Sequence, residues 1–363
     1  TQQDGLFIRS QENPVLNWTN RIVVTPSATG GRISSFSSYG LSPDLQLKPD
    51  LGAPGGSIFS TYPLEAGGFN TLGGTSMSSP HVAGAAALLL QNNPQIPAMS
   101  MRNILQNSAE PKLWSGNPAL GFLDMVHRQG AGMINVASSA NATTYITPGK
   151  IAAGEGEAGP FTQRLTVSNS GSEAVTYQLS SVNALSTGGV ITPSFFQGNA
   201  SVSFSSDTLT VPAGGSTTVD VTINPATTPV NGQYGGYIVF TPQAAGQVYR
   251  VPFAGFVGDY QGIQILTPTA NGFPWLATLN GNTFSRCLES CTYSMQGTDM
   301  PWFLMHFDHH ARYMEMNILH AATKRPVHPV FHKTNVMEYL PRNSTATGFF
   351  NYTWDGTRLH SNG

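Results

Sequence analysis

Charged side chains are scarce in this sequence of 363 residues. Asp, Glu, Lys and Arg together make up only 10% of it, and the formal net charge at pH 7 is −2. Proteins that bind nucleic acid neutralise phosphates with Lys and Arg gathered on one surface, and this composition offers no such surface. We therefore expect no nucleic-acid partner.

Long apolar runs are also lacking. The longest stretch built only of apolar residues and glycine runs from Val82 to Leu90, whereas a transmembrane helix needs about 20 apolar residues. The sequence therefore predicts no membrane span. No leader peptide is recognisable either, and the chain begins with Thr1 rather than Met. We expect that a leader and more have been removed, or that this is an excerpt of a longer polypeptide.

Cysteine is limited to two residues, Cys287 and Cys291, in the stretch CLESC. A pair this close forms either a small-loop disulfide in an oxidising compartment or two free thiols. Of the two, we favour the disulfide.

In place of charge, the polar residues are mostly Ser, Thr, Asn, Gln and Gly, a composition that suits a secreted protein. Acceptor sequons for N-glycosylation point the same way, because they are used only on the secretory route. The candidate acceptors are Asn17, Asn141, Asn199, Asn343 and Asn351.

The length predicts two or three domains. Up to about residue 137, short apolar strands (RIVVTP and SIFSTY) alternate with helical patterns over Pro80–Gln91 and Ser100–Asn107, which predicts part of an α/β domain. In the second helix Ser100 is placed to act as the N-cap. Its apolar face would consist of Met101, Ile104 and Leu105.

From about residue 138 to residue 258, apolar and polar residues alternate between turns of Gly, Ser, Asn and Pro. This pattern is typical of an antiparallel β-sandwich. Residues 259–363 contain further strand-like runs, such as WFLMHFD and RYMEMNILHA, and stop as though another strand should follow. The predicted fold class is therefore α/β followed by all-β, with a second β-sandwich that is incomplete.

The stretch LGGTSMSSPHVAGAAALLL, Leu72 to Leu90, places a serine between a glycine-rich loop and an apolar helix. Glycine permits close backbone approach, and Pro80 suits the first turn of a helix. Ser76 would then lie beside free N–H groups at a helix N-terminus, which can stabilise an oxyanion during acyl transfer. The alternative is that Ser76 or Ser78 only caps the helix.

The stretch GTSMSSPHVAGAAALL resembles the serine motif of the subtilisin-like serine proteases, or subtilases, at every fixed position. Three further stretches, SSFSSYG, LKPDLGAPGGSIFSTYP and QGAGMINVASSA, are similar to segments that surround the catalytic serine in that family. The resemblance covers about residues 20 to 137.

The resemblance implies roles for five residues. Ser76 would be the nucleophile and its backbone N–H an oxyanion donor, with the Thr75 hydroxyl supporting the oxyanion hole. Leu72, Gly73 and Gly74 would bind substrate beside the scissile bond.

The resemblance also implies a division of the chain. Residues 1–19 would end an inserted protease-associated region, and residues 20–137 would form the C-terminal part of the catalytic domain. A fibronectin type III-like sandwich (138–258) and a second β-rich domain (259–363) would follow.

A serine nucleophile needs a base, usually a histidine oriented by a carboxylate. In subtilases the aspartate, the histidine and the oxyanion asparagine all precede the serine, yet no histidine precedes Ser76 here. Three aspartates precede Ser76, namely Asp4, Asp44 and Asp50. The sequence around each of them does not resemble the family's aspartate motif. His81 lies about 140° around the helix from Ser76, and no family pattern places a base at His127.

One more polar cluster is present, MHFDHH, with His306, Asp308, His309 and His310. On a strand, alternate members would share a face and could bind a divalent ion, whereas in a hairpin loop they would be solvated. Three ligands without a clear fourth favour the loop, so we assign no metal and no cofactor. Lys48 and Asp50 are expected to form a modest surface ion pair.

Two hypotheses of function follow. The first is the C-terminal part of a secreted, glycosylated, extracellular or cell-wall-associated serine endopeptidase. Its substrate is a polypeptide, and its partner is the upstream half of the same protease, so this chain alone is inactive. The second is a non-catalytic adhesion or substrate-docking module that carries a protease remnant.

Overall fold

The computed structural model describes residues 2–13, 15, 27, 29–189, 192–325 and 333–356. It divides into two units, Thr1–Gly30 and Gly31–Gly363. The first contains one helix, α1 (Gln2–Ser10). The candidate acceptor Asn17 and the expected strand RIVVTP lie outside the described residues.

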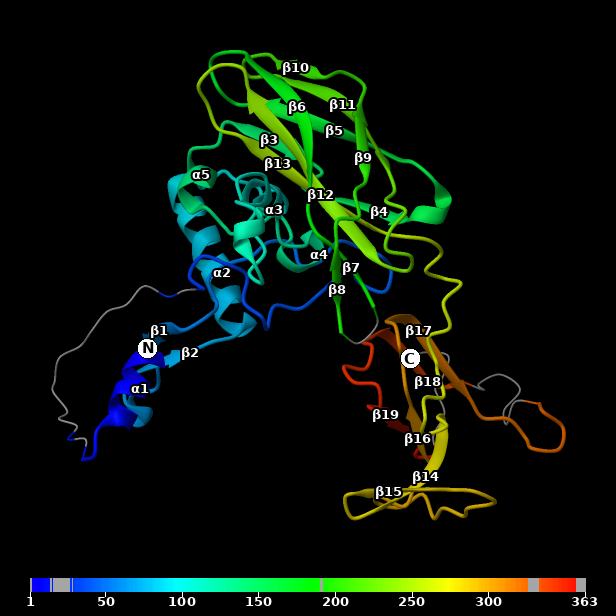
Figure 1. Ribbon diagram of the computed structural model, residues 1–363. Helices are drawn as coiled ribbons and strands as arrows, with labels where there is room; N and C mark the ends of the chain where they lie inside the picture. Colours follow the sequence, from blue (N-terminus) through cyan, green and yellow to red (C-terminus); the bar gives the residue numbers. More distant parts are fainter. Residues whose placement is uncertain are drawn as a thin grey trace. The chain divides into compact units, whose positions relative to one another are not determined.

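The second unit opens with a helical segment, residues 31–143, that holds the serine motif. A short hairpin leads into the long helix α2, and three shorter helices follow (Figure 1). Its elements are β1 (Ile58–Thr61), η1 (Leu64–Ala66), β2 (Phe69–Leu72), α2 (Thr75–Asn92), α3 (Ala98–Asn107), η2 (Pro118–Leu120), α4 (Val126–Gln129) and α5 (Val136–Ala140).

Both predicted helices of this segment are present, but each begins earlier than expected. α2 begins at Thr75, so Pro80 lies inside the helix rather than in its first turn. α3 begins at Ala98 with Pro97 at the N-cap, so the expected cap at Ser100 is wrong. Proline has a fixed φ that suits the start of a helix, and Pro97 therefore sets the boundary before Ser100 is reached. The predicted apolar face of α3 is confirmed, because Ile104 and Leu105 are buried and Met101 packs against them.

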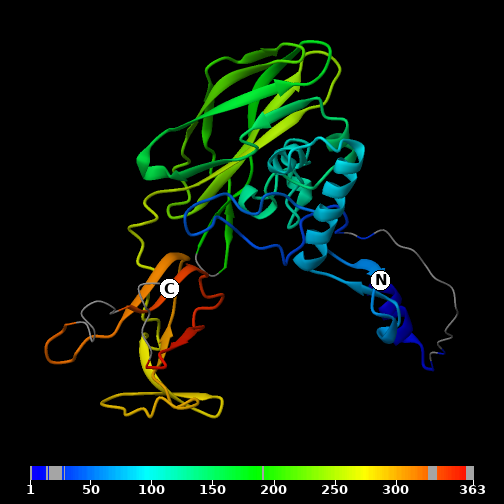
Figure 2. The same ribbon diagram turned by 180° about the vertical axis from the view of Figure 1, so that it is seen from behind.

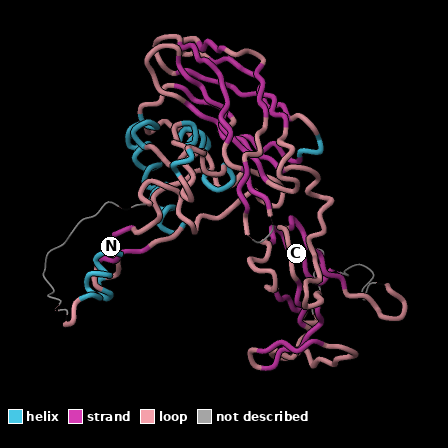
Figure 3. Tube along the Cα trace, in the orientation of Figure 1, coloured by secondary structure: helices cyan, strands magenta, loops and turns pink. Residues whose placement is uncertain are grey.

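Strands dominate from residue 144 onward (Figure 3). Two sheets form a β-sandwich. One sheet runs in the order β10 (Thr208–Val211), β6 (Val175–Asn183), β12 (Gln233–Pro242), β13 (Tyr249–Phe256) and β4 (Ile151–Glu155), and β7 (Ser186–Gly188) joins β12 to β8 (Ser194–Phe196). The other runs β3 (Thr144–Thr147), β5 (Phe161–Asn169), β11 (Ser216–Asn224) and β9 (Ser201–Phe204). A short turn, η3 (Gly156–Ala158), follows β4.

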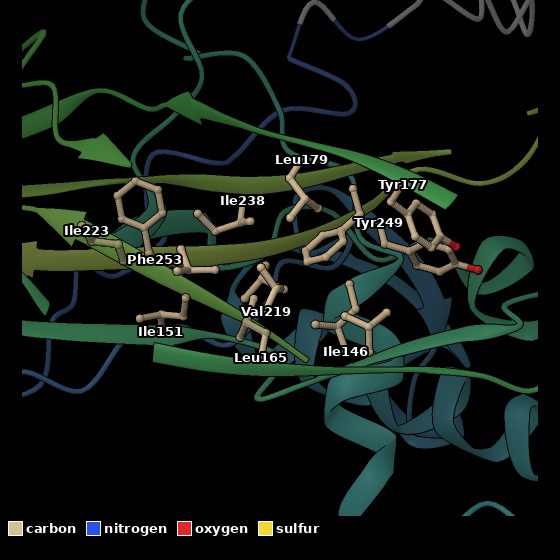
Figure 4. Close-up of a cluster of buried hydrophobic side chains, with 14 of the residues drawn as sticks. Ile146, Ile151, Leu165, Tyr177, Leu179, Val219, Ile223, Ile238, Tyr249 and Phe253 are labelled. Carbon is tan, nitrogen blue, oxygen red and sulfur yellow. The ribbon is translucent and has the colours of Figure 1, made fainter. Parts of the chain in front are cut away.

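The predicted alternation produces the sandwich core. Along β11, Val219, Val221 and Ile223 are buried while the residues between them are only partly covered. Together with Leu165 of the same sheet, they pack against the facing sheet in a cluster that includes Leu179, Ile238 and Phe253 (Figure 4). Burial of each such side chain stabilises the fold by about 1.5–3 kcal/mol.

Strand β12 is buried on both faces, which its unbroken run YIVF indicates. Ile238 and Phe240 point into the sandwich core. Tyr237 and Val239 instead belong to a second core that also contains Leu47 and Val126 of the helical segment. The helical segment and the sandwich therefore share a hydrophobic core.

Hydrogen bonds reinforce this shared core. The Tyr237 hydroxyl donates to the carbonyl of Gly130 at 2.9 Å. The Leu185 N–H donates to the carbonyl of Leu123 at 3.1 Å. α4 is buried along its whole length. Figure 2 shows the helical segment and the sandwich from behind.

The remaining residues form a smaller all-β part. One sheet has the order β15 (Thr283–Arg286), β14 (Trp275–Asn280), β16 (Trp302–Met305) and β19 (Phe350–Thr353), and β17 (Ala311–Asn317) pairs with β18 (Lys333–Leu340). Two small clusters centred on Leu304 and Phe307 form its core. The predicted class, α/β followed by all-β, is confirmed.

The shared core leads to a first prediction. Tyr237→Phe removes the donor to Gly130 and leaves a buried carbonyl unsatisfied, so the free energy of unfolding should fall by about 1–2 kcal/mol. Urea unfolding of the full chain measures it. Tyr62→Phe is the matched control, because Tyr62 is 39% exposed, and its change should stay within about 0.5 kcal/mol. Equal losses in both variants would contradict the prediction.

Candidate active site

Ser76 is the second residue of α2 and is exposed to solvent. The N-cap is Gly74, and no side chain forms a capping hydrogen bond. The alternative in which Ser76 or Ser78 merely caps the helix is therefore wrong. Ser76 therefore lies in the first turn of α2, at the positive end of the helix dipole.

A glycine-rich loop, residues 52–57, holds the serine turn. The N–H of Gly74 donates to the carbonyl of Gly55 at 2.8 Å, and the N–H of Met77 donates to the carbonyl of Gly74 at 3.0 Å. A Cβ at Gly55 would lie only 2.1 Å from Ser78 Oγ and 2.9 Å from the carbonyl oxygen of Gly74. Only glycine therefore permits the two loops to approach this closely.

The loop itself is tied to a segment far along the chain. The N–H of Gly52 donates to the carbonyl of Gly132, and the N–H of Ile134 donates back to the carbonyl of Gly52, both at 2.8 Å. Met133 in turn exchanges two hydrogen bonds of 2.8 Å with Glu110. The serine turn is thus positioned through Gly55 and Gly52 by the stretch QGAGMINV.

The residues implied in substrate binding directly precede the turn. Leu72 ends β2, which pairs antiparallel with β1, and Gly73 and Gly74 follow it. The rings of Phe59 and Phe69 stack across the hairpin with centroids 5.6 Å apart. The structure therefore brings Leu72, Gly73, Gly74, Thr75 and Ser76 together as one continuous strand-to-helix turn.

The helical segment contains two histidines, and both are engaged elsewhere. The ring Nδ1 of His81 lies 2.8 Å from the carbonyl oxygen of Met77, one turn back along α2. His127 is buried in α4, where its Nε2 lies 2.7 Å from Thr187 Oγ1 of the sandwich. Complete burial, aided by the charge of Arg128, lowers the pKa of His127 to about 3, so this ring is neutral. Neither histidine is placed as a base for Ser76.

Asp50 forms a larger network than expected. It pairs with Lys48 and also with Lys150 at the start of β4, whose Nζ lies 2.7 Å from Asp50 Oδ1. Partial burial alone would raise the pKa of Asp50, but the hydrogen bonds from Lys150 and Lys48 outweigh it and lower the pKa. The ion pair therefore connects the helical segment to the sandwich, which the spacing of Lys48 and Asp50 did not indicate.

The MHFDHH cluster occupies the connection between β16 and β17. His306 is buried, with Nδ1 2.6 Å from the carbonyl oxygen of Gly348 and Nε2 3.0 Å from Asp308 Oδ1. The ring of His309 packs against Tyr260. Within the described ranges, no group of three His, Cys, Asp or Glu residues is arranged to hold a metal ion.

The other candidate residues are distributed over the strands and loops. Cys287 and Cys291 form a disulfide after β15. Asn141, Asn199 and Asn351 are exposed, but Asn343 is only 5% exposed and its Oδ1 accepts a hydrogen bond from the N–H of Phe307. In the described part of the chain, no helix is long and apolar enough to cross a bilayer.

Sequence reasoning missed two contributors to the serine turn. The sequence places Gly55 and Met133 only within two stretches that are similar to segments around the catalytic serine of subtilases, and it assigns no contact to either residue. The glycine pair Gly55–Gly56 was the available signal, because adjacent glycines often mark a close backbone approach. Nothing local in the sequence indicates that Met133 pairs with Gly52 and Glu110.

The close contact at Gly55 generates a second prediction. Gly55→Ala should lower the free energy of unfolding by about 1–3 kcal/mol, because the added methyl group overlaps Ser78 and Gly74. Gly84→Ala is the control within α2, where an added Cβ meets nothing within 4 Å, and it should raise stability by about 0.5–1 kcal/mol. Chemical denaturation of both variants measures the difference. A neutral Gly55→Ala would refute the close approach.

The Asp50 network generates a third prediction. Because its pKa is lowered in the folded state, Asp50 stabilises the protein above the ordinary carboxyl pKa, and this contribution is lost as pH falls through the lowered value. Lys150→Met should lower the free energy of unfolding by about 1 kcal/mol at pH 7. It should also make the decrease of that free energy below pH of about 4 less steep. Denaturation at several pH values measures both effects. Lys324→Met is the control, because Lys324 is an exposed loop lysine, and it should change neither the free energy of unfolding at pH 7 nor its decrease in acid. If Lys150→Met leaves the decrease in acid unchanged, the assignment is contradicted.

Two regions of the chain match models of known protein families. Residues 9–132 match the model of the subtilase family, and residues 154–254 match that of an Fn3-like domain. The PI-type proteinase of Lactococcus lactis subsp. cremoris is 30% identical over 301 residues, which are 73% of this chain and 15% of that protein. The C5a peptidase of Streptococcus pyogenes serotype M3 is 35% identical over 153 residues, 40% of this chain and 13% of the peptidase.

The chain thus spans no more than 15% of the length of these curated relatives. Among solved structures, the PapD-like domain 7 of human CEP192 was aligned with a TM-score of 0.26 and 20% sequence identity. The alignment covers 31% of this chain and 84% of the CEP192 domain. A likeness this low adds nothing to the assignment. Residues 9–132 therefore match the subtilase family, and an Fn3-like match follows them in residues 154–254.

Proposed function

We propose that this chain is the C-terminal part of a secreted subtilisin-like serine endopeptidase, in which Ser76 is the nucleophile. The observation that carries the proposal is the position of Ser76 in the first turn of α2, where its side chain is exposed to solvent at the positive end of the helix dipole. A polypeptide is the substrate, in keeping with the proteinase and peptidase names of the relatives.

The turn suits acyl transfer. Attack of Ser76 Oγ on a peptide carbonyl forms a tetrahedral intermediate whose oxyanion needs donors already in place. The N–H of Ser76 supplies one donor, and the hydroxyl of Thr75 supports it from the preceding residue. Leu72, Gly73 and Gly74 present extended backbone next to the serine, where the peptide flanking the scissile bond would lie.

The proton of Ser76 must pass to a base, and neither histidine of the helical segment, His81 or His127, is placed to accept it. We therefore infer that the aspartate, the histidine and the oxyanion asparagine come from an upstream half of the same polypeptide. On its own the chain is inactive. A serine hydroxyl without such a base is a weak nucleophile at neutral pH.

An exposed apolar surface supports the inference of an upstream half. From Val82 to Leu90, α2 consists only of apolar residues and glycine, yet only Ala85 and Leu89 are buried, while Leu88 is 56% exposed and Leu90 is 41% exposed. The β1–β2 hairpin similarly exposes Phe59 and Phe69. A helix that is apolar on all sides is normally buried, so this face suits the missing part of the catalytic domain.

Secretion is proposed on separate grounds. A disulfide between Cys287 and Cys291 forms in an oxidising compartment. Three sequon asparagines are exposed and accessible to a glycosyl donor, namely Asn141, Asn199 and Asn351. We therefore propose an extracellular, glycosylated protein, with attachment to a cell wall as one form of that location.

The second candidate function is a non-catalytic adhesion or docking module. The sequence before Ser76 favours it, because it contains no histidine that could serve as the base. This function requires binding to a polymer or cell wall by residues 138–363 and no reaction at Ser76.

Serine labelling separates the two functions and is the fourth prediction. The native secreted protein should react with a tagged fluorophosphonate, and mass spectrometry should find the label on Ser76 in a band heavier than this chain. Ser76→Ala should abolish the label because the nucleophile is gone. Ser79→Ala, an exposed serine on the same helix, should retain it.

Each other outcome rejects the protease. A label that persists in Ser76→Ala places the reactive serine elsewhere. No label, with the chain present at its own size, favours the docking module. In that case binding of residues 138–363 to cell-wall polymer is the measurement that follows.

A further inference from the structure

A small cavity of about 60 Å³ lies where the helical segment, the sandwich and the C-terminal β part meet. Tyr39 comes from the first, Thr187 from the second, and His309, His310 and Arg342 from the third, with Tyr260 at their junction. We call it the junction cavity. None of the functions proposed above uses it.

The walls of the junction cavity carry basic groups without an acidic one. Arg342, His309 and His310 line it, and no lining residue is an Asp or Glu. The nearby carboxylate, Asp308, already pairs with His306. The Tyr260 hydroxyl is also engaged, because it donates to the carbonyl of His310 at 3.1 Å.

Arg342 is the group that most needs a partner. Its Nη1 is buried and has no hydrogen-bond acceptor among the described residues. A guanidinium cannot lose its proton at physiological pH, so the charge and the donor remain. Leaving a buried charged donor unsatisfied is costly, and native proteins seldom do so without a ligand, an ion or water.

The two histidines respond to the same positive charge. Burial, followed by the charges of Arg342 and His309, lowers the pKa of His310 to about 4. Burial also lowers the pKa of His309, with Asp308 opposing and Arg342 adding to the shift. Both imidazoles are therefore neutral near pH 7 and would gain a proton if negative charge entered the cavity.

We propose that the junction cavity binds one small oxyanion, a sulfate, phosphate or carboxylate group, through Arg342 with His309 and His310 beside it. A water needs about 10–15 Å³ of such space, so the cavity holds roughly four to six heavy atoms, the size of a single such group. Guanidinium and imidazolium are the side chains that bind oxyanions most strongly. The bound anion would hold the C-terminal β part against the other two.

The proposal predicts that affinity rises as pH falls. Protonation of His309 and His310 is easier with the anion bound, and binding therefore takes up protons. The other titratable groups at the cavity do not oppose this, because burial raises the pKa of Tyr39 and raises that of Tyr260 to about 12, which keeps both neutral. Asp308 stays paired with His306.

Sulfate is the probe for the fifth prediction, because its charge is constant across this pH range. Equilibrium dialysis of the full chain with radiolabelled sulfate should show one site per chain and tighter binding at pH 5.5 than at pH 7.5. Arg342→Gln should weaken binding about tenfold or more. Arg286→Gln is the matched control, since Arg286 stacks over Trp275 and does not line the cavity.

His310→Gln is a second variant that tests the site even if Arg342→Gln fails to fold. It should keep most of the affinity at pH 7.5 but lose much of the gain at pH 5.5. The proposal is overturned if wild-type chain binds no sulfate. It is also overturned if Arg286→Gln weakens binding as much as Arg342→Gln, or if His310→Gln keeps the full pH dependence.

Discussion

The backbone from Gly130 to Ile134 is the constraint on which the rest of this structure depends. On one side it hydrogen-bonds to Gly52 and Glu110, and on the other the Tyr237 hydroxyl of the sandwich donates to Gly130. Through Gly52 the same segment fixes the loop that holds Gly74 and so the position of Ser76. The exposed turn at Ser76 is therefore linked, through Gly130, to a buried β-strand more than a hundred residues away.

Two of the ion-pair groups in this chain involve the helical segment near its contact with the sandwich. Asp124 is fully buried beside Arg128, with Oδ2 3.5 Å from Nη1, and Arg128 also donates to the carbonyl of Ser34 at 2.9 Å. Burial raises the pKa of Asp124 although Arg128 opposes the shift. These bonds hold the helical segment together internally, whereas the pair of Asp50 and Lys150 crosses to the sandwich and fixes orientation there, since charged hydrogen bonds are directional.

Much of this could be predicted from sequence, because the signals are local. Alternation along β11 and the glycine-rich turn before α2 depend on neighbouring residues, and both predictions hold. The early start of α3 at Pro97, the Lys150–Asp50 pair and the buried sequon at Asn343 depend on residues far apart or on competing caps. The roles of Ser76, Thr75 and the substrate-binding residues stay predictions, as does the boundary at residue 137, which the shared core crosses.

That shared core bears on how such a protein can change over generations. Val239 and Phe256 pack against Leu47 and Val126 within one cluster, so a substitution on either side alters the surface that the other must fit. A β-sandwich with polar outer faces can be moved between genes as an independent domain, because it does not depend on a neighbour for its packing. This sandwich instead shares its core with the helical segment. We therefore expect the two parts to be inherited together, with paired substitutions at their contact.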